Sequence, residues 1–113
     1  MATGLVEDAL ADTRVVFVMG ARQTGKSTLL EGIARQRWGQ GVITLDDAAT
    51  RSAAEADPTS FIANLATPAA IDEVQRVPDL LLAIKQRVDR DQQPGQFLLS
   101  GSSNVKTNRK VKD

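Results

Sequence analysis

Short apolar runs alternate with amphipathic stretches along the chain, and this alternation predicts strands followed by helices. Residues 15–19 (VVFVM) form a continuous apolar run that ends at Gly20. Such a run is typical of a strand that is buried on both faces of a parallel sheet. Three further apolar runs, each bounded by turn-forming residues, predict three more strands, at residues 42–45, 69–71 and 96–100.

Helical spacing of the apolar positions predicts the segments between these strands. One helix is predicted from Lys26, and on it Glu31 and Arg35 are placed to form an i,i+4 ion pair. An aspartate that caps free N–H groups, or a proline in the first turn, marks other helix starts. Further helices are predicted at three places, after Asp57-Pro58, after Val77-Pro78 and over Leu5–Leu10. The order predicts an α/β fold with helices flanking a parallel sheet of about four strands.

The composition of the 113-residue chain excludes several kinds of site. The chain has no Cys and no His, so disulfides, thiol nucleophiles, a histidine base and the usual zinc sites are excluded. Carboxylates and hydroxyls remain as ligands, and these suit a hard cation such as Mg²⁺. No apolar run approaches the roughly 20 residues that a membrane span needs, so we expect a soluble, cytoplasmic protein without a membrane partner.

The charge balance is neutral overall but uneven along the chain, with 14 Lys and Arg against 14 Asp and Glu. Four basic residues are concentrated near the C-terminal end, at Lys106, Arg109, Lys110 and Lys112. A run this short is usually solvated, so it only weakly indicates contact with nucleic acid. We expect residues 105–113 to form a basic flexible tail, with little or only local order from Asn104 onward.

The strongest chemical signal is a phosphate-binding motif between the first strand and the helix that follows it. Residues 20–27 (GARQTGKS) match the P-loop (Walker A) pattern G-x-x-x-x-G-K-[ST]. In such a loop Lys26 contacts the β- and γ-phosphates, while the Ser27 hydroxyl ligates Mg²⁺. The alternative for Arg22 is that it points to solvent or a partner. The predicted ATP-binding residues are Gly20, Ala21, Arg22, Gln23, Thr24, Gly25, Lys26, Ser27 and Thr28.

A second signal follows the apolar run 69–71, where Asp72 and Glu73 have the form of a Walker B element. In that element the strand brings Asp72 to the Mg²⁺ beside the P-loop. A carboxylate next to the Mg²⁺ ligand can orient an attacking water, so Glu73, with Lys26, is predicted to be catalytic. The alternative is that both acidic residues simply begin a loop.

Two other polar groups at strand ends are candidates of lower specificity. Ser100 and Ser102 would face the γ-phosphate as sensor-like residues if their strand lies between the P-loop strand and the Walker B strand. A plain turn is the alternative for both. Asp46 and Asp47 resemble a metal-binding pair, but a polar turn after residues 42–45 is the favoured interpretation.

Taken together, these strings resemble a known family. They are GARQTGKS, ITLDD (43–47), Asp57-Pro58, IDEVQRVPDL (71–80) and FLLSGSS (97–103). They are similar to the AAA-superfamily ATPase core of prokaryotic ATP-binding proteins that carry a C-terminal domain of unknown function. The resemblance covers Thr13 to Asn104, and its most specific part is Asp-Glu-x-Gln-x-x-Pro. It implies Mg²⁺-ATP as ligand, with Glu73 as the catalytic glutamate, Asp72 as the Mg²⁺ ligand and residues 100–103 as sensor-like.

The resemblance also implies an architecture. It predicts a three-layer P-loop NTPase fold whose strands lie in the order 15–19, 96–100, 69–71, 42–45. We expect an N-terminal helix over residues 1–12, the N-terminal part of a P-loop core over 13–104, and the tail. Family members continue far beyond this point, so the chain is expected to be a truncated half with an incomplete sheet. Its P-loop strand would then form an exposed edge that favours self-association.

The favoured function is ATP binding, with ATP hydrolysis if the missing half completes the site. Turnover by this chain alone is expected to be very slow, because no arginine is held against the γ-phosphate. One alternative is a catalytically inactive nucleotide-binding remnant or partner module. Another is a small-molecule P-loop kinase, although Glu73 favours water as the acceptor. A GTPase is disfavoured because Gln75 stands where D-x-x-G needs glycine. The sequence leaves open a protein or DNA partner.

Overall fold

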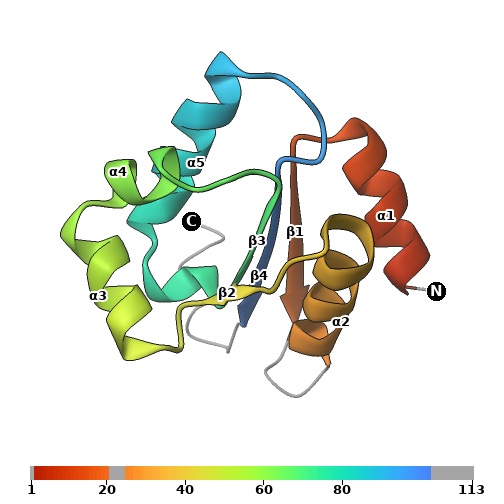
Figure 1. Cartoon of the computed structure of the whole chain (residues 1–113), viewed down its shortest axis with the longest axis horizontal. Coiled ribbons are helices and arrows are strands. Elements are labelled where there is room, and N and C mark those ends of the chain that lie inside the picture. Colours follow the sequence, from red (N-terminus) through yellow and green to blue (C-terminus); the bar gives the residue numbers. More distant parts are fainter. Residues whose placement is uncertain (1, 21–24, 103–113) are drawn as a thin grey trace.

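The computed structural model describes residues 2–20 and 25–102, which form one α/β unit (Figure 1). Its strands are β1 (Val15–Gly20), β2 (Ile43–Thr44), β3 (Ala69–Asp72) and β4 (Phe97–Ser102). Its α-helices are α1 (Ala2–Asp12), α2 (Lys26–Ile33), α3 (Ala48–Ala56), α4 (Pro58–Ala63) and α5 (Asp79–Arg90). A π-helical turn, η1 (Ala34–Trp38), extends α2, and a 3₁₀ turn, η2 (Val74–Arg76), follows β3.

The four strands form one parallel sheet in the order β1-β4-β3-β2. This is the order predicted from the sequence, and β4, the last strand along the chain, lies between β1 and β3. Val15 is paired with Phe97, and Ala69 is paired with Phe97 on the other side. Because all strands run in the same direction, their carboxyl ends meet at one edge of the sheet, where ligands bind in open α/β folds.

Helices cover both faces of the sheet and complete three layers. Figure 1 shows α1 and α2 on one face and α3, α4 and α5 on the other. Side chains alternate accordingly along the central strands: Phe97 and Leu99 pack into the core beside α5, whereas Leu98 packs against α1 and α2. This alternation follows from the two-residue period of a strand, and it explains why consecutive residues of the central strands are apolar up to Ile71 and Leu99.

Several elements differ in extent from the sequence prediction. The second strand is short, since only Ile43 and Thr44 pair with β3. The N-terminal helix extends beyond Leu5–Leu10 and lies within the expected range 1–12. Helix α3 was not predicted, because its sequence is polar and alanine-rich and buries only Ala54. The length of β2 and the presence of α3 depend on contacts with distant residues, which the local spacing of apolar residues does not indicate.

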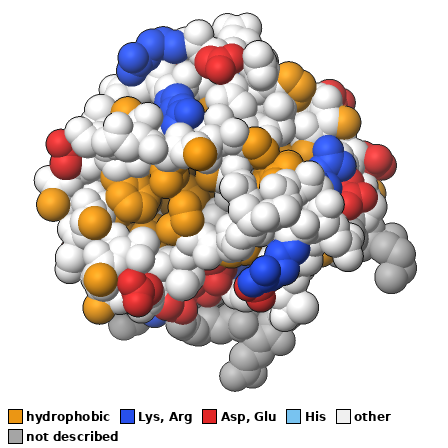
Figure 2. Space-filling model, in the orientation of Figure 1, with side chains coloured by type: hydrophobic (Ala, Val, Ile, Leu, Met, Phe, Trp, Pro, Cys, Tyr) orange, Lys and Arg blue, Asp and Glu red, His pale blue; other side chains and the backbone are white. Residues whose placement is uncertain are grey.

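Strand β1 forms one edge of the described sheet, where apolar side chains remain exposed. Phe17 is 41% exposed and Met19 is 48% exposed. Phe17 and Leu81 line a groove of about 260 Å³ between β1 and α5. Hydrophobic side chains also gather in the middle of the face drawn in Figure 2, with charged side chains around them. Part of the apolar surface of the described chain is therefore open to a partner.

Candidate functional site

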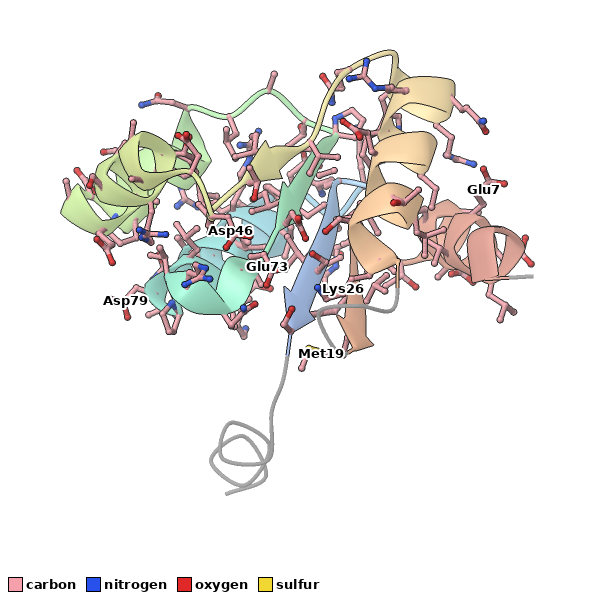
Figure 3. The ribbon with its side chains drawn as sticks, turned by 90° about the horizontal axis from the view of Figure 1, so that it is seen from below. Glu7, Met19, Lys26, Asp46, Glu73 and Asp79 are labelled. Atoms are coloured by element: carbon pink, nitrogen blue, oxygen red, sulfur yellow. The ribbon has the colours of Figure 1, made fainter. Side chains whose placement is uncertain are left out.

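The carboxyl ends of β1, β4 and β3 meet the start of α2 at one edge of the sheet. Gly20 ends β1, Ser102 ends β4 and Asp72 ends β3. In Figure 3 the labelled Lys26 and Glu73 lie near each other at this edge. The parallel strands thus bring together side chains that stand 45 to 47 positions apart in the sequence.

Helix α2 starts at this edge directly after Gly25. The backbone of Gly25 is left-handed, with φ 80° and ψ 13°, a conformation that glycine adopts without steric cost. Lys26 is buried in the first turn, whereas Ser27 and Thr28 are exposed there. The other residues of the predicted phosphate loop, Ala21, Arg22, Gln23 and Thr24, lie outside the described residues.

Lys26 and Glu73 form a buried ion pair at the centre of the site. The Lys26 Nζ atom lies 3.0 Å from Glu73 Oε2, and the two side chains are only 3% and 4% exposed. Charges so deeply buried are retained only when they are paired, because removing one partner leaves the other without solvent or counter-charge. The two residues with predicted catalytic roles are therefore each other's main partner in this structure.

The backbone at Glu73 has an unusual conformation. Its φ of 59° and ψ of 45° are left-handed, and Glu73 is the one non-glycine residue with positive φ within residues 2–20 and 25–102. This conformation costs an L-residue about 1–2 kcal/mol, so surrounding contacts must hold it. One such contact is the hydrogen bond that the Glu73 N–H donates to Ser100 Oγ at 3.1 Å.

Three side chains donate hydrogen bonds to the Glu73 carboxylate. Gln75 Nε2 donates to Oε1 at 2.7 Å, while Ser102 Oγ and Lys26 Nζ donate to Oε2 at 3.1 and 3.0 Å. Burial raises the pKa of Glu73, but the bonds from Gln75, Lys26 and Ser102 and the charge of Lys26 outweigh it. The pKa falls from 4.5 to about 2, so the carboxylate is ionised at neutral pH.

This lowered pKa makes the stability contributed by Glu73 depend on pH. A carboxylate whose folded-state pKa is depressed stabilises the fold above its unfolded value of 4.5, and that contribution is lost as the pH falls toward 2. Relative to Glu73→Gln, wild type should lose roughly 3 kcal/mol of unfolding free energy across this range. Urea unfolding of both proteins at several pH values, without metal, measures the difference. A constant difference would contradict the expected ionisation.

Asp72 links β3 to both neighbouring parts of the site. Its Oδ2 atom accepts a hydrogen bond from Ser27 Oγ at 2.8 Å, and its Oδ1 atom accepts one from Ser100 Oγ. Ser27 and Asp72 also line a cavity of about 200 Å³ beside the start of α2. A hydroxyl and a carboxylate that face each other beside an open cavity are oxygen ligands suited to a hard cation such as Mg²⁺.

Two acidic residues singled out in the sequence do not join this cluster. Asp47 caps α3, because its side chain accepts a hydrogen bond from the Thr50 N–H at 2.9 Å. Asp46 forms an ion pair with Arg76 of η2. The polar turn is therefore confirmed in preference to a metal-binding pair for these two aspartates.

Sequence reasoning missed the part that Gln75 plays in the site. The sequence gives Gln75 no role in the site, yet its side chain contacts both Glu73 and Ser102. The available signal was its place two residues after Glu73 in the Asp-Glu-x-Gln-x-x-Pro string.

Comparison with known proteins identifies the family. A model of the AAA domain matches residues 12–113. Uncharacterized proteins of Mycobacterium tuberculosis and Mycobacterium bovis are each 34% identical to the chain over 103 residues, which is 90% of this chain and 23% of either relative. The chain thus spans about a quarter of their length. No solved structure matches the chain significantly.

Within the described residues, every helix is too short or too polar to cross a membrane.

The family match covers the sheet, the start of α2 and the cluster around Asp72 and Glu73. The chain belongs to the AAA domain family, and it is a nucleotide-binding domain of the P-loop ATPase type.

Proposed function

We propose that the chain binds Mg²⁺-ATP at the carboxyl ends of β1, β4 and β3 and that this site hydrolyses ATP. One observation carries the proposal. A buried lysine at the start of α2 and a serine next to it contact two consecutive carboxylates at the end of β3, Lys26 with Glu73 and Ser27 with Asp72. These are the charges and oxygen ligands that a nucleoside triphosphate and its cation require.

The donor set fits Mg²⁺-ATP residue by residue. Ser27 and Asp72 would hold the cation through their facing oxygens. Lys26 would contact the β- and γ-phosphates, with the N–H groups at the start of α2 adding positive charge. Bound Mg²⁺ would neutralise charge on the phosphates. Ser100 holds Asp72, and Ser102 holds Glu73, so both serines are suited to respond to the γ-phosphate.

Binding would exchange the partner of Lys26. Its ammonium group is paired with Glu73 at 3.0 Å, and a phosphate would take the place of this carboxylate. The Glu73 carboxylate would then be free of Lys26, and it could accept a hydrogen bond from water and orient that water toward phosphorus. This exchange is the step that would convert the resting site into a reactive one.

Two other functions remain as alternatives to hydrolysis. A domain that binds nucleotide without turnover needs Lys26, Ser27 and Asp72 but not Glu73. A small-molecule kinase would transfer the phosphoryl group to a substrate hydroxyl. The position of Glu73 directly after Asp72, in the form of a Walker B element, favours water as the acceptor.

Thermal unfolding with and without nucleotide tests the proposal. A ligand that binds only the native state stabilises it, by about 2.7 kcal/mol when its concentration is 100 times the dissociation constant. Saturating Mg²⁺-ATP should therefore raise the melting temperature by several degrees, and EDTA should reduce the shift. Release of inorganic phosphate in the same samples separates hydrolysis from binding alone. An unmoved melting temperature in a folded sample would refute nucleotide binding.

We also infer that the chain self-associates through the edge formed by β1. The exposed Phe17 and Met19 side chains, with the groove beside α5, offer apolar surface next to a strand edge that pairs with no other strand of the described chain. Phe17→Lys should lower the apparent mass in light scattering. Leu5→Lys is the matched control, because Leu5 is 72% exposed on α1. A wild-type chain that stays monomeric at high concentration would rule out this association.

A further inference from the structure

The Gln75 side chain connects Glu73 to the end of β4. Its Nε2 atom donates to Glu73 Oε1 at 2.7 Å, and its Oε1 atom accepts from the Ser102 N–H at 3.1 Å. Ser102 closes the ring, since its own hydroxyl donates to Glu73 Oε2 at 3.1 Å. Two residues, Gln75 of η2 and Ser102 of β4, thus hold the Glu73 carboxylate and each other.

The orientation of the Gln75 amide is determined by the backbone of β4. The Ser102 N–H can only donate, so it requires the amide oxygen of Gln75 and turns the NH₂ group toward Glu73. The reverse orientation would place an oxygen against the carboxylate and leave two N–H donors facing each other. Gln75 therefore presents a fixed donor to Glu73, whatever the partner of Lys26.

The Gln75 amide packs closely against the backbone of Gly101 in β4. A Cβ atom at Gly101 would lie 3.2 Å from Gln75 Oε1 and 3.1 Å from both Phe17 and Met19 side chains. The absence of a side chain at Gly101 thus leaves room for the amide at the end of β4. Gln75 is half-buried there, and its amide oxygen is held by the backbone of β4.

We propose that Gln75 is a positioning residue that fixes the Glu73 carboxylate after Lys26 has left it for a phosphate. This inference rests on the proposed function. With Lys26 paired to phosphate, Glu73 keeps two donors, Gln75 on Oε1 and Ser102 on Oε2. Two donors on different oxygens fix both the position and the rotation of a carboxylate. Glu73 is thereby held where it can orient water instead of following Lys26 toward the phosphates.

The first test needs no ATP turnover. Lys26→Met removes the ammonium group that ATP is proposed to draw away, and the Glu73 side-chain rotamer is then read from three-bond NMR couplings in glutamate-labelled protein. We expect a single rotamer in Lys26→Met and averaging over several rotamers when Gln75→Met is added. Adding Gln86→Met instead, at an exposed position on α5, should leave the single rotamer. Equal rotamer distributions with and without Gln75 would overturn the proposal.

The second test uses the otherwise unaltered chain and does not depend on the folding of Lys26→Met. Gln75→Met should lower kcat about 10- to 100-fold, the scale of a small misplacement of a reacting group. The KM for Mg²⁺-ATP and the ATP-induced melting shift should stay the same, whereas a loss of general structure would change both. Gln75→Glu, which puts an acceptor beside the carboxylate, should lower kcat further. An unchanged kcat in both variants would overturn the proposal.

The two tests separate failure of this inference from failure of the proposed function. If wild type neither binds nor hydrolyses Mg²⁺-ATP, the proposed function fails, and the rotamer measurement still decides whether Gln75 fixes Glu73. If wild type turns over ATP and the Gln75 variants match it, the function stands and the positioning role is refuted.

Discussion

Glu73→Gln is expected to lower ATP turnover about 10²- to 10⁴-fold while leaving the melting shift caused by Mg²⁺-ATP in place, because general-base groups contribute on this scale. The amide keeps the size of the side chain, and its oxygen can still accept from Lys26. It lacks the negative charge that orients an attacking water. Phosphate release under saturating nucleotide, compared with the melting shift in the same buffer, measures the two effects separately.

A matched control for this substitution is Glu55→Gln. Glu55 lies exposed on α3, away from the cluster, and the same loss of one carboxylate there should change neither turnover nor binding. If Glu73→Gln turns over ATP at the wild-type rate, the hydrolysis proposal loses its base, and nucleotide binding without turnover becomes the better account. If it also loses the melting shift, Glu73 acts in binding.

Lys26→Met is expected to abolish the melting shift caused by Mg²⁺-ATP and also to destabilise the protein without nucleotide. The second effect follows from the buried pair, since Glu73 would keep its charge but lose the ammonium group 3.0 Å away. Breaking a buried ion pair from one side costs about 3–5 kcal/mol. Adding Glu73→Gln removes the uncompensated charge and should recover much of this loss, without recovering the nucleotide effect.

The control for the lysine is Lys85→Met on α5. Lys85 pairs with Asp89 in an exposed i,i+4 bridge, with its side chain 70% exposed, and such bridges contribute little to stability. This variant should melt close to wild type and retain the full nucleotide shift. A Lys26→Met protein that still responds to Mg²⁺-ATP like wild type would contradict the assignment of Lys26 to the phosphates.

The sheet and the meeting of the start of α2 with the end of β3 were predictable because short patterns determine them. The apolar run before Asp72 indicates a buried strand, and a G-x-x-x-x-G-K-[ST] string after another strand indicates a helix start at Lys26. Two parallel strands with one strand between them must then bring these ends together. The family match supports the same fold and a nucleotide-binding domain.

Other features depend on contacts between distant residues, which no single segment reveals. The hydrogen bond from Ser102 to Gln75 depends on how far β4 extends, and the sequence predicted its end at Ser100, not at Ser102. Helix α3 begins at a cap from Asp47 and contributes almost no apolar surface, so its sequence lacks the usual period. The left-handed backbone at Glu73 is unusual for a glutamate, and it follows from tertiary contacts.

The edge position of β1 has a consequence for amide hydrogen exchange. In a parallel strand the N–H and C=O groups of one residue point to the same side, and the Arg14 C=O accepts from Phe97 of β4. Val16 and Val18 therefore direct their amides toward β4, whereas Val15, Phe17 and Met19 direct theirs away from it. Within the described part of the chain, no other strand pairs with this outer side. Exchange along β1 should alternate between slow and fast residues, and any strand that docks there would selectively slow the fast ones.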